Sequence, residues 1–143
     1  MPDALDEIVG LFSGSPKGMR LELLLDYANR LPPLPERFSE GHDQMEQVHE
    51  CQTPFFVAAD LVDGVAMLHF DALPEAPMTR GYASVLAEGL NGASAEEVLS
   101  VPNDFYVGMG LGELISPLRL RGMSAILGTV KRLIAQELET APG

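Results

Sequence analysis

The sequence is poor in cysteine, with Cys51 alone among 143 residues. One cysteine cannot close an internal disulfide, complete the thiolate set of a structural zinc site or hold an iron–sulfur cluster by itself. Its sulfur is therefore an inert buried thiol, a single metal ligand or a reactive group. The neighbours Glu50, Gln52 and Pro54 are typical of a loop before a strand, which favours a thiol available for chemistry.

Basic residues are also scarce. Only 9 lysines and arginines stand against 21 aspartates and glutamates, so the formal net charge is −12. Such a charge repels phosphate backbones and anionic lipids, so we expect neither nucleic acid nor a membrane as a partner. A basic partner surface would complement the charge, although the need for solubility alone would also explain it.

Long apolar runs are absent, and the acidic residues 1–7 do not resemble the basic start of a signal peptide. We therefore expect a cytoplasmic protein whose thiol is kept reduced. The length suits a single domain, 1–143, with its own hydrophobic core. The glycine-rich stretch 108–112 follows no clear strand, so we do not interpret it as a nucleotide-binding motif.

Helical spacing of apolar residues predicts five helices. The first lies between Asp3, as its N-cap, and Gly14. The expected spans of the others are 16–31, 78–90, 95–99 and 117–138. In the second helix one buried stripe is predicted, with the members Leu21, Leu24, Leu25, Ala28 and Leu31. The prolines of segment 31–36 make it a stiff extended connector, while residues 101–115 carry no readable pattern.

A β-hairpin is predicted in the middle of the chain. Residues 55–61 and 65–71 flank Asp63-Gly64, the dipeptide that best suits a two-residue type I′ turn. Pairing across this turn gathers apolar side chains on one face: Val57, Ala59, Leu61, Ala66, Leu68 and Phe70. Helices must cover that face. Alternation within residues 45–50 predicts a short edge strand as well.

Four elements follow one another along the chain: Arg30-Leu31-Pro32-Pro33-Leu34-Pro35-Glu36, Val48-His49-Glu50-Cys51-Gln52, Arg80-Gly81, and Ile115-Ser116-Pro117-Leu118-Arg119 with Gly122 and Met123. In this order they resemble the SufE family of sulfur acceptor proteins, over nearly the whole chain. The resemblance implies an α+β fold like that of the IscU-type cluster scaffold, with helices packed on a three-stranded antiparallel sheet.

The resemblance also implies a function. Cys51 would take sulfur from the persulfide of a cysteine desulfurase of the SufS or CsdA type and carry it toward a SufBCD-type scaffold for iron–sulfur cluster assembly. A protein of this kind stimulates its desulfurase and is a sulfur carrier rather than an enzyme. The PLP cofactor would belong to the desulfurase, so we expect no cofactor and no metal in this chain.

Several side chains near Cys51 are implicated in the same way. Arg119 matches the family's arginine near the cysteine loop. Glu75 matches an acidic residue that the family has before the pair Arg80-Gly81. Gln52 and His49 lie on either side of the cysteine. They would orient the loop or contact the desulfurase. Otherwise Arg119 is an ordinary cation near a helix start, and Glu75 a solvated loop charge.

The cysteine loop departs from the family pattern in one respect. Glu50 stands where the family usually has glycine, and Pro54 follows in place of a Ser-Gln-Val-Trp-like continuation. Glu50 should disfavour the Cys51 thiolate electrostatically, and Pro54 should stiffen the exit of the loop.

Two alternatives stay open. The protein could stimulate a desulfurase by docking alone, with an incidental thiol. It could also be a metal-binding module with suitable ligand types at these positions: His42, Asp43, His49, Cys51 and, on the hairpin, His69.

Overall fold

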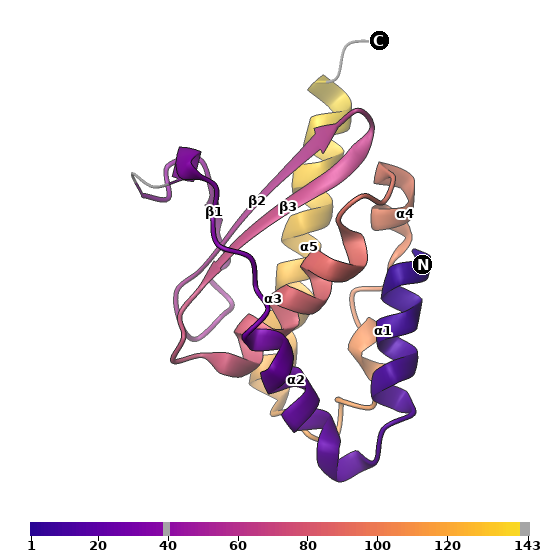
Figure 1. Ribbon diagram of the computed structural model, residues 1–143. Helices are drawn as coiled ribbons and strands as arrows, with labels where there is room; N and C mark the ends of the chain where they lie inside the picture. The colour runs from indigo at the N-terminus through magenta and orange to yellow at the C-terminus, as the bar shows by residue number, and fades with distance from the viewer. Residues whose placement is uncertain (39–40, 141–143) are drawn as a thin grey trace.

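The computed structural model describes residues 1–38 and 41–140, and this part of the chain forms five α-helices and a three-stranded antiparallel sheet (Figure 1). The helices are α1 (Asp3–Ser13), α2 (Arg20–Ala28), α3 (Pro77–Leu90), α4 (Ala95–Ser100) and α5 (Pro117–Thr140). The strands are β1 (Glu46–Gln47), β2 (Phe55–Val62) and β3 (Val65–Ala72). The expected α+β class with three antiparallel strands is confirmed.

The hairpin of β2 and β3 has the predicted register. Val57 lies opposite Phe70, and Ala59 lies opposite Leu68. The turn residues Asp63 and Gly64 both adopt positive φ angles, 53° and 82°, as a type I′ turn requires. The apolar face is therefore formed as the sequence indicates.

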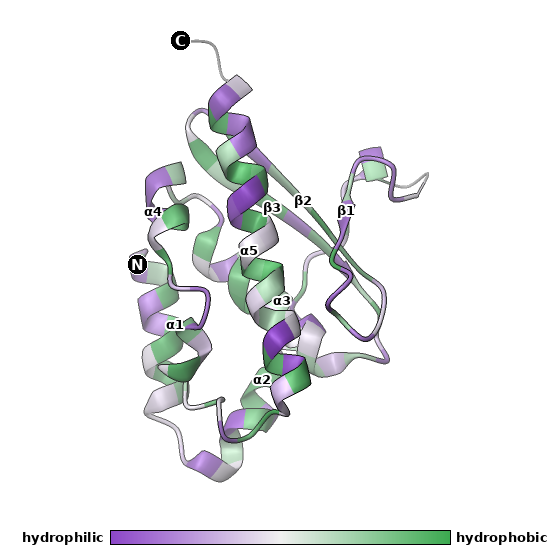
Figure 2. Cartoon of the chain, turned by 180° about the vertical axis from the view of Figure 1, so that it is seen from behind, coloured by the Kyte–Doolittle hydropathy of each residue, from purple (hydrophilic) through white to green (hydrophobic). Residues whose placement is uncertain are grey.

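Two layers build the molecule. On the apolar face of the sheet, α5 packs along β2 and α3 along β3, while α1 and α2 pack on α3. Figure 2 shows from behind that α5 runs obliquely across the hairpin, over the part that ends in the turn. This packing buries the apolar face of the sheet and the side chains of α5 that face it, including Met123, Ile126 and Val130. None of the described helices has the length and apolarity needed to cross a membrane.

The beginnings and ends of the first two helices differ from the prediction. Pro2, not Asp3, is the N-cap of α1, and no side chain caps it. The second helix begins only at Arg20, after a 3₁₀ turn, and ends at Ala28. Leu25 is 40 % exposed, because the face of α2 that meets α3 carries Leu24, Tyr27 and Ala28 instead. Of the predicted stripe, Leu25 is therefore exposed, and Leu31, although buried, lies beyond the end of the helix.

The Arg80-Gly81 pair joins α2 to α3. The Arg80 side chain donates hydrogen bonds to the Ala28 carbonyl (3.1 Å) and the Ala72 carbonyl (2.7 Å). A Cβ at Gly81 would lie 3.1 Å from the Leu24 carbonyl carbon and closer still to its oxygen. The two helix backbones therefore touch at a point where only glycine fits.

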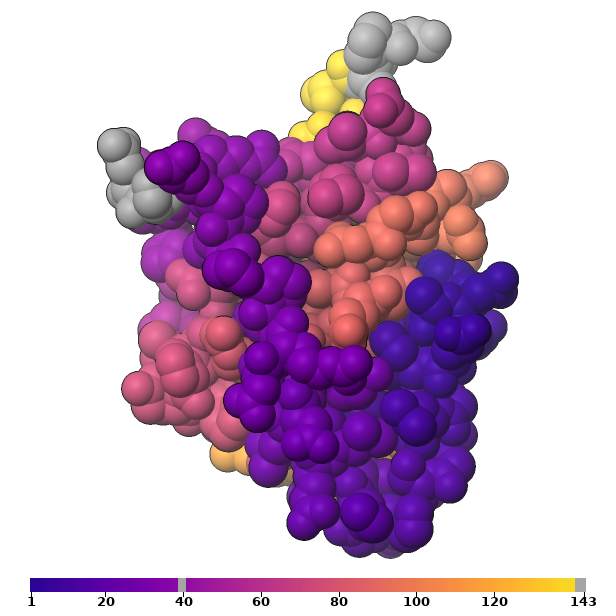
Figure 3. Space-filling model, viewed as in Figure 1, coloured from indigo at the N-terminus to yellow at the C-terminus, as the bar shows by residue number. Residues whose placement is uncertain are grey.

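The outer edge of β3 is covered. Leu68 donates its N–H to Asn91 Oδ1 (2.7 Å), and Ala66 bonds to the loop after α3 through both of its backbone groups. The proline connector lies against the same strand, where it lines a small cavity with Leu68 and Phe70. Figure 3 shows the segment after α2 running over this face of the molecule.

Residues 101–115, which carry no readable pattern, are packed around the base of the helices. They include a 3₁₀ helix, Phe105–Val107, and bury Phe105, Met109 and Leu111. Gly110, at φ 75°, lies under the guanidinium of Arg20, which donates to the last carbonyls of α1. Residues 101–115 therefore contribute side chains to the hydrophobic core.

Candidate functional site

Residues 48–54 form a loop that carries Cys51 between β1 and β2. Its base is closed by Val48, which is buried and donates its N–H to the Phe55 carbonyl (2.9 Å). Within the loop, the Cys51 N–H donates to the Val48 carbonyl (3.3 Å). The sequence-based placement of the cysteine in a loop before a strand is confirmed.

Cys51 is half-buried, because its loop lies flat on α5. A Cβ at Gly122 would be 3.5 Å from Cys51 Sγ and 3.6 Å from both Cys51 Cα and the Glu50 carbonyl oxygen. The missing side chain of Gly122 therefore lets the loop backbone rest on the helix backbone. The thiol itself packs against the hydrophobic core. It is less exposed than its polar sequence neighbours suggest.

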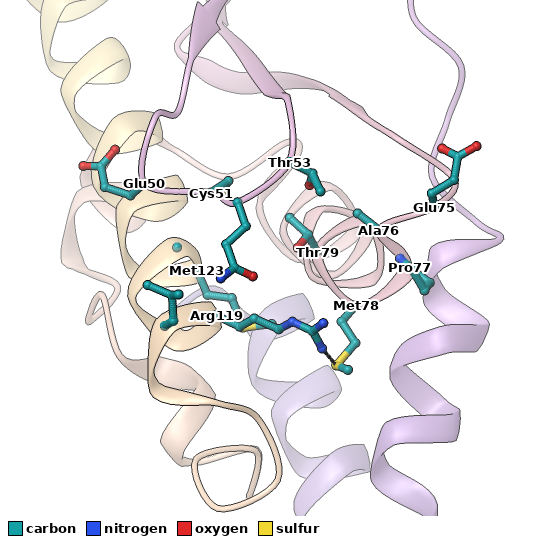
Figure 4. A pocket seen from close by; sticks show the side chains of 13 residues that line it. Glu50, Cys51, Thr53, Glu75, Ala76, Pro77, Met78, Thr79, Arg119 and Met123 are labelled. Atoms are coloured by element: carbon teal, nitrogen blue, oxygen red, sulfur yellow. Dashed lines mark hydrogen bonds between the residues drawn. The ribbon is translucent and has the colours of Figure 1, made fainter.

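A pocket of about 180 Å³ opens beside the thiol (Figure 4). Three segments far apart in the sequence supply its walls: the cysteine loop, the start of α3 with the turn before it, and the start of α5. The lining residues are Glu50, Cys51, Gln52, Thr53, Glu75, Ala76, Pro77, Met78, Thr79, Leu118, Arg119, Gly122 and Met123.

Among the described residues that line the pocket, Arg119 is the only basic one. Its side chain extends from α5 across the pocket toward α3, where Nη1 lies 3.6 Å from Met78 Sδ (Figure 4). No carboxylate of the described residues lies within ion-pair distance of it. The guanidinium brings one positive charge to the pocket, but it is not among the causes that set the pKa of Cys51, which are burial and the charge of Glu50.

The other predicted site residues divide into two groups. Gln52 and Glu75 line the pocket, although the Glu75 carboxylate points away from it (Figure 4). His49 is exposed and is not among the lining residues. Sequence reasoning missed the walls formed by Met78 and Thr79, since no pattern marks them and only the tertiary fold brings them to the loop.

The environment of Cys51 keeps the thiol protonated. Burial, and secondly the charge of Glu50, raise the pKa of Cys51 from 9.0 to about 11. The expected effect of Glu50 is confirmed in direction. Burial is the larger cause, and it depends on the contact with α5 rather than on the sequence of the loop.

This shift predicts the pH dependence of thiol reactivity. Because only the thiolate is alkylated, the rate constant for iodoacetamide should rise about tenfold per pH unit and level off only near pH 11. Glu50→Gln removes the smaller cause, so its profile should shift to lower pH and its rate at neutral pH should rise about threefold.

Glu75→Gln is the matched control, since Glu75 lines the same pocket but does not contribute to the shift. Its profile should follow that of the wild type. Superimposable profiles for Glu50→Gln and the wild type would contradict the assigned role of Glu50.

The proposed metal ligands are not brought together. His42 Nε2 lies 2.6 Å from Asp71 Oδ2, and its ring stacks on Phe56 with 3.6 Å between centroids. His69 packs instead against Phe38. Across residues 1–38 and 41–140 there is no group of three or more histidine, cysteine, aspartate or glutamate side chains placed to hold a metal ion. The metal-binding alternative therefore finds no support in this part of the chain.

A family model described as "SufE: Fe-S metabolism associated domain" matches residues 6–134. An uncharacterized SufE-like protein of Mycobacterium tuberculosis is 48 % identical over 137 residues, which are 95 % of this chain and 94 % of that protein. SufE-like protein 1, chloroplastic/mitochondrial, of Arabidopsis thaliana is 31 % identical over 92 % of this chain, which is 35 % of that longer protein.

The fold is likewise similar to a solved structure. The solution structure of a hypothetical protein from Thermus thermophilus matches with a TM-score of 0.87 and 43 % sequence identity, over 98 % of this chain and 99 % of that one. The family model and the SufE-like names of the sequence relatives support a role in Fe-S metabolism.

Proposed function

Because the chain belongs to the SufE family, we propose that Cys51 accepts a sulfur atom from the persulfide of a cysteine desulfurase and carries it to an iron–sulfur cluster scaffold. The observation that supports this most is the half-buried Cys51 thiol, which lines a pocket together with Arg119, the one basic residue among the described lining residues. Such a pocket can shelter a bound sulfur atom from reductants.

The transfer is an exchange at sulfur. The Cys51 thiolate attacks the outer sulfur of the donor persulfide, a new S–S bond forms to Cys51, and the S–S bond of the donor breaks. The donor cysteine leaves as a thiolate and takes up a proton. The number of S–S bonds and electrons is conserved, so the step needs neither an oxidant nor a reductant.

The resting protein is not ready for this step, because the pKa of Cys51 is raised to about 11. We therefore propose that docking to the desulfurase lifts the loop from Gly122, which hydrates the thiol, favours the thiolate and brings it to the donor. A solved complex in which the loop still rests on Gly122 would contradict this.

The partners follow from the same proposal. The donor is a SufS-type or CsdA-type desulfurase, which carries the PLP, and the recipient is a SufBCD-type scaffold. This chain then works without a cofactor of its own, as a carrier that stimulates the desulfurase. A free thiol that must stay reduced favours the cytoplasm as the compartment of the reaction.

The test is the intact mass of the protein after incubation with a SufS-type desulfurase and L-cysteine. The wild type should gain at least one sulfur atom, a thiol reductant should reverse the gain, and Cys51→Ser should show none. If the wild type gains no sulfur while the desulfurase is demonstrably active, the proposal is wrong.

The same variant separates sulfur acceptance from activation by docking alone. With Cys51 as acceptor, Cys51→Ser should fail to stimulate sulfide release by the desulfurase. A Cys51→Ser protein that stimulates as well as the wild type would identify the chain as a docking activator.

A further inference from the structure

Strand β2 is paired on both sides for only part of its length. All eight of its residues pair with β3, whereas β1 pairs only with Phe56 and Val57. Figure 1 shows the hairpin extending beyond β1 toward its turn. Along residues 58–62 no described strand lies beside the outer edge of β2.

The hydrogen bonds near β1 show which backbone groups face this edge. The Phe55 carbonyl accepts from the Val48 N–H (2.9 Å), so the backbone groups of Phe55 point to the side of β1. In a strand every second residue points the same way. Ala59 and Leu61 therefore direct their N–H and C=O groups toward the outer edge.

The hydrogen bonds on the outer side of β3 give the same orientation for the backbone groups of Ala59. Leu68, the partner of Ala59, turns its N–H away from β2 to Asn91 Oδ1 (2.7 Å). In an antiparallel ladder, residues directly opposite each other either both bond across the pair or both point outward. Ala59 must then point outward as well. No described residue hydrogen-bonds to the backbone groups of Ala59 or Leu61 at this edge.

A groove of about 280 Å³ runs beside this edge. It lies between the segment before β1 and the last turns of α5, which contributes Leu133 and Glu137. Its lining includes four carboxylates: Asp43, Glu46, Asp60 and Glu137. Arg37 pairs with Asp60 and Arg132 with Glu46.

The groove keeps an excess of negative charge. Within the described part of the chain, Asp43 and Glu137 have no cationic partner at ion-pair distance. Ala59 is only 8 % exposed, so water reaches its backbone groups poorly and a bonding partner would satisfy them. The edge thus combines unused main-chain hydrogen-bonding groups with an acidic lining.

We propose that this edge binds an extended, lysine- or arginine-bearing segment of a partner protein by strand addition to β2. The main chain of the segment bonds to Ala59 and Leu61, and its alternate basic side chains meet Asp43 and Glu137. A second copy of this chain is a poor occupant, because it carries a net charge of −12 and presents the same acidic edge. The site is separate from Cys51 and does not depend on its chemistry.

Amide hydrogen exchange measured by NMR tests the proposal. The probe is a capped hexapeptide of alternating lysine and valine, and the control peptide replaces each lysine with glutamate. At saturation the lysine peptide should slow exchange at Ala59 and Leu61 by at least about tenfold. Ala58 and Asp60 are internal controls, since their N–H groups already face β3 and should change little.

Two charge variants test the acidic lining. Asp43→Asn and Glu137→Gln should each weaken binding of the lysine peptide by about threefold, and added salt should weaken it further. Glu139→Gln, on the same helix but outside the groove, is the matched control and should bind as the wild type does. Absence of binding, binding without protection at Ala59 and Leu61, or equal binding of the glutamate peptide would each overturn the proposal.

Discussion

Replacing Gly122 with valine should raise the alkylation rate constant of Cys51 at neutral pH by at least about tenfold. Position 122 is where the cysteine loop rests on α5, and an added Cβ would just touch Cys51 and Glu50 at 3.5 to 3.6 Å. The two methyl groups of valine extend about 1.5 Å beyond that Cβ and have no room under the loop. The loop must therefore move off the helix.

The expected size of the effect follows from the pKa. Moving off the helix removes the burial but not the charge of Glu50, so the pKa of Cys51 falls from about 11 toward 9.0 and the thiolate fraction at neutral pH increases by up to about 100-fold. A thiolate of lower pKa is a weaker nucleophile, which reduces the gain to about tenfold. Loss of the steric cover then adds to it.

Two controls separate displacement of the loop from general effects on α5. Gly122→Ala fits in van der Waals contact, so its alkylation rate should stay within about twofold of the wild type. Gly128→Val places the same side chain in the same helix, where a Cβ would approach only Asn103, at 3.8 Å. A Gly122→Val protein that reacts no faster than these two would show that Gly122 does not seat the loop.

Gly81→Ala should destabilise the protein by about 3 kcal/mol. The added Cβ would meet the carbonyl group of Leu24, which belongs to the backbone of α2 and cannot rotate away. To admit it, α2 and α3 must separate, and the hydrogen bond from Arg80 to the Ala28 carbonyl must stretch. Urea unfolding followed by far-UV circular dichroism measures the change.

Gly10→Ala is the matched control for that variant, because it makes the same substitution inside α1, where a Cβ would meet nothing within 4 Å. Alanine there should stabilise the protein by about 0.5 to 1 kcal/mol through helix propensity. The two variants are therefore expected to shift the unfolding midpoint in opposite directions. Equal midpoints would refute the close approach of α2 and α3 as the reason for glycine at position 81.

The two glycines show why motif residues need a tertiary explanation. Gly81 and Gly122 both belong to elements by which the sequence resembles the SufE family, yet neither adopts a positive φ angle. Glycine is needed at both positions because a backbone segment packs where a side chain would be: the backbone of α2 at Gly81 and the cysteine loop at Gly122. Sequence identifies such positions, but only the packed structure gives the reason.

In the cysteine site, too, some features follow from the local sequence and others only from the tertiary structure. The polar neighbours of Cys51 and the following proline predict a loop, and Glu50 predicts an opposing charge; both are local effects and both are found. The larger effect, burial, comes from α5 about 70 positions later in the chain. Likewise Arg119 and Met78 meet in the pocket only because the fold brings the start of α5 to the start of α3.

The sequence by itself determined the elements whose signals are local: the hairpin with its Asp63-Gly64 turn and the long last helix. These depend on turn geometry and hydrophobic period, which act between neighbours in the chain. Tertiary structure alone decided the length of α2, the burial of Cys51 and the open edge of β2. Each depends on contacts between segments far apart in the sequence, and no local pattern records which segments will meet.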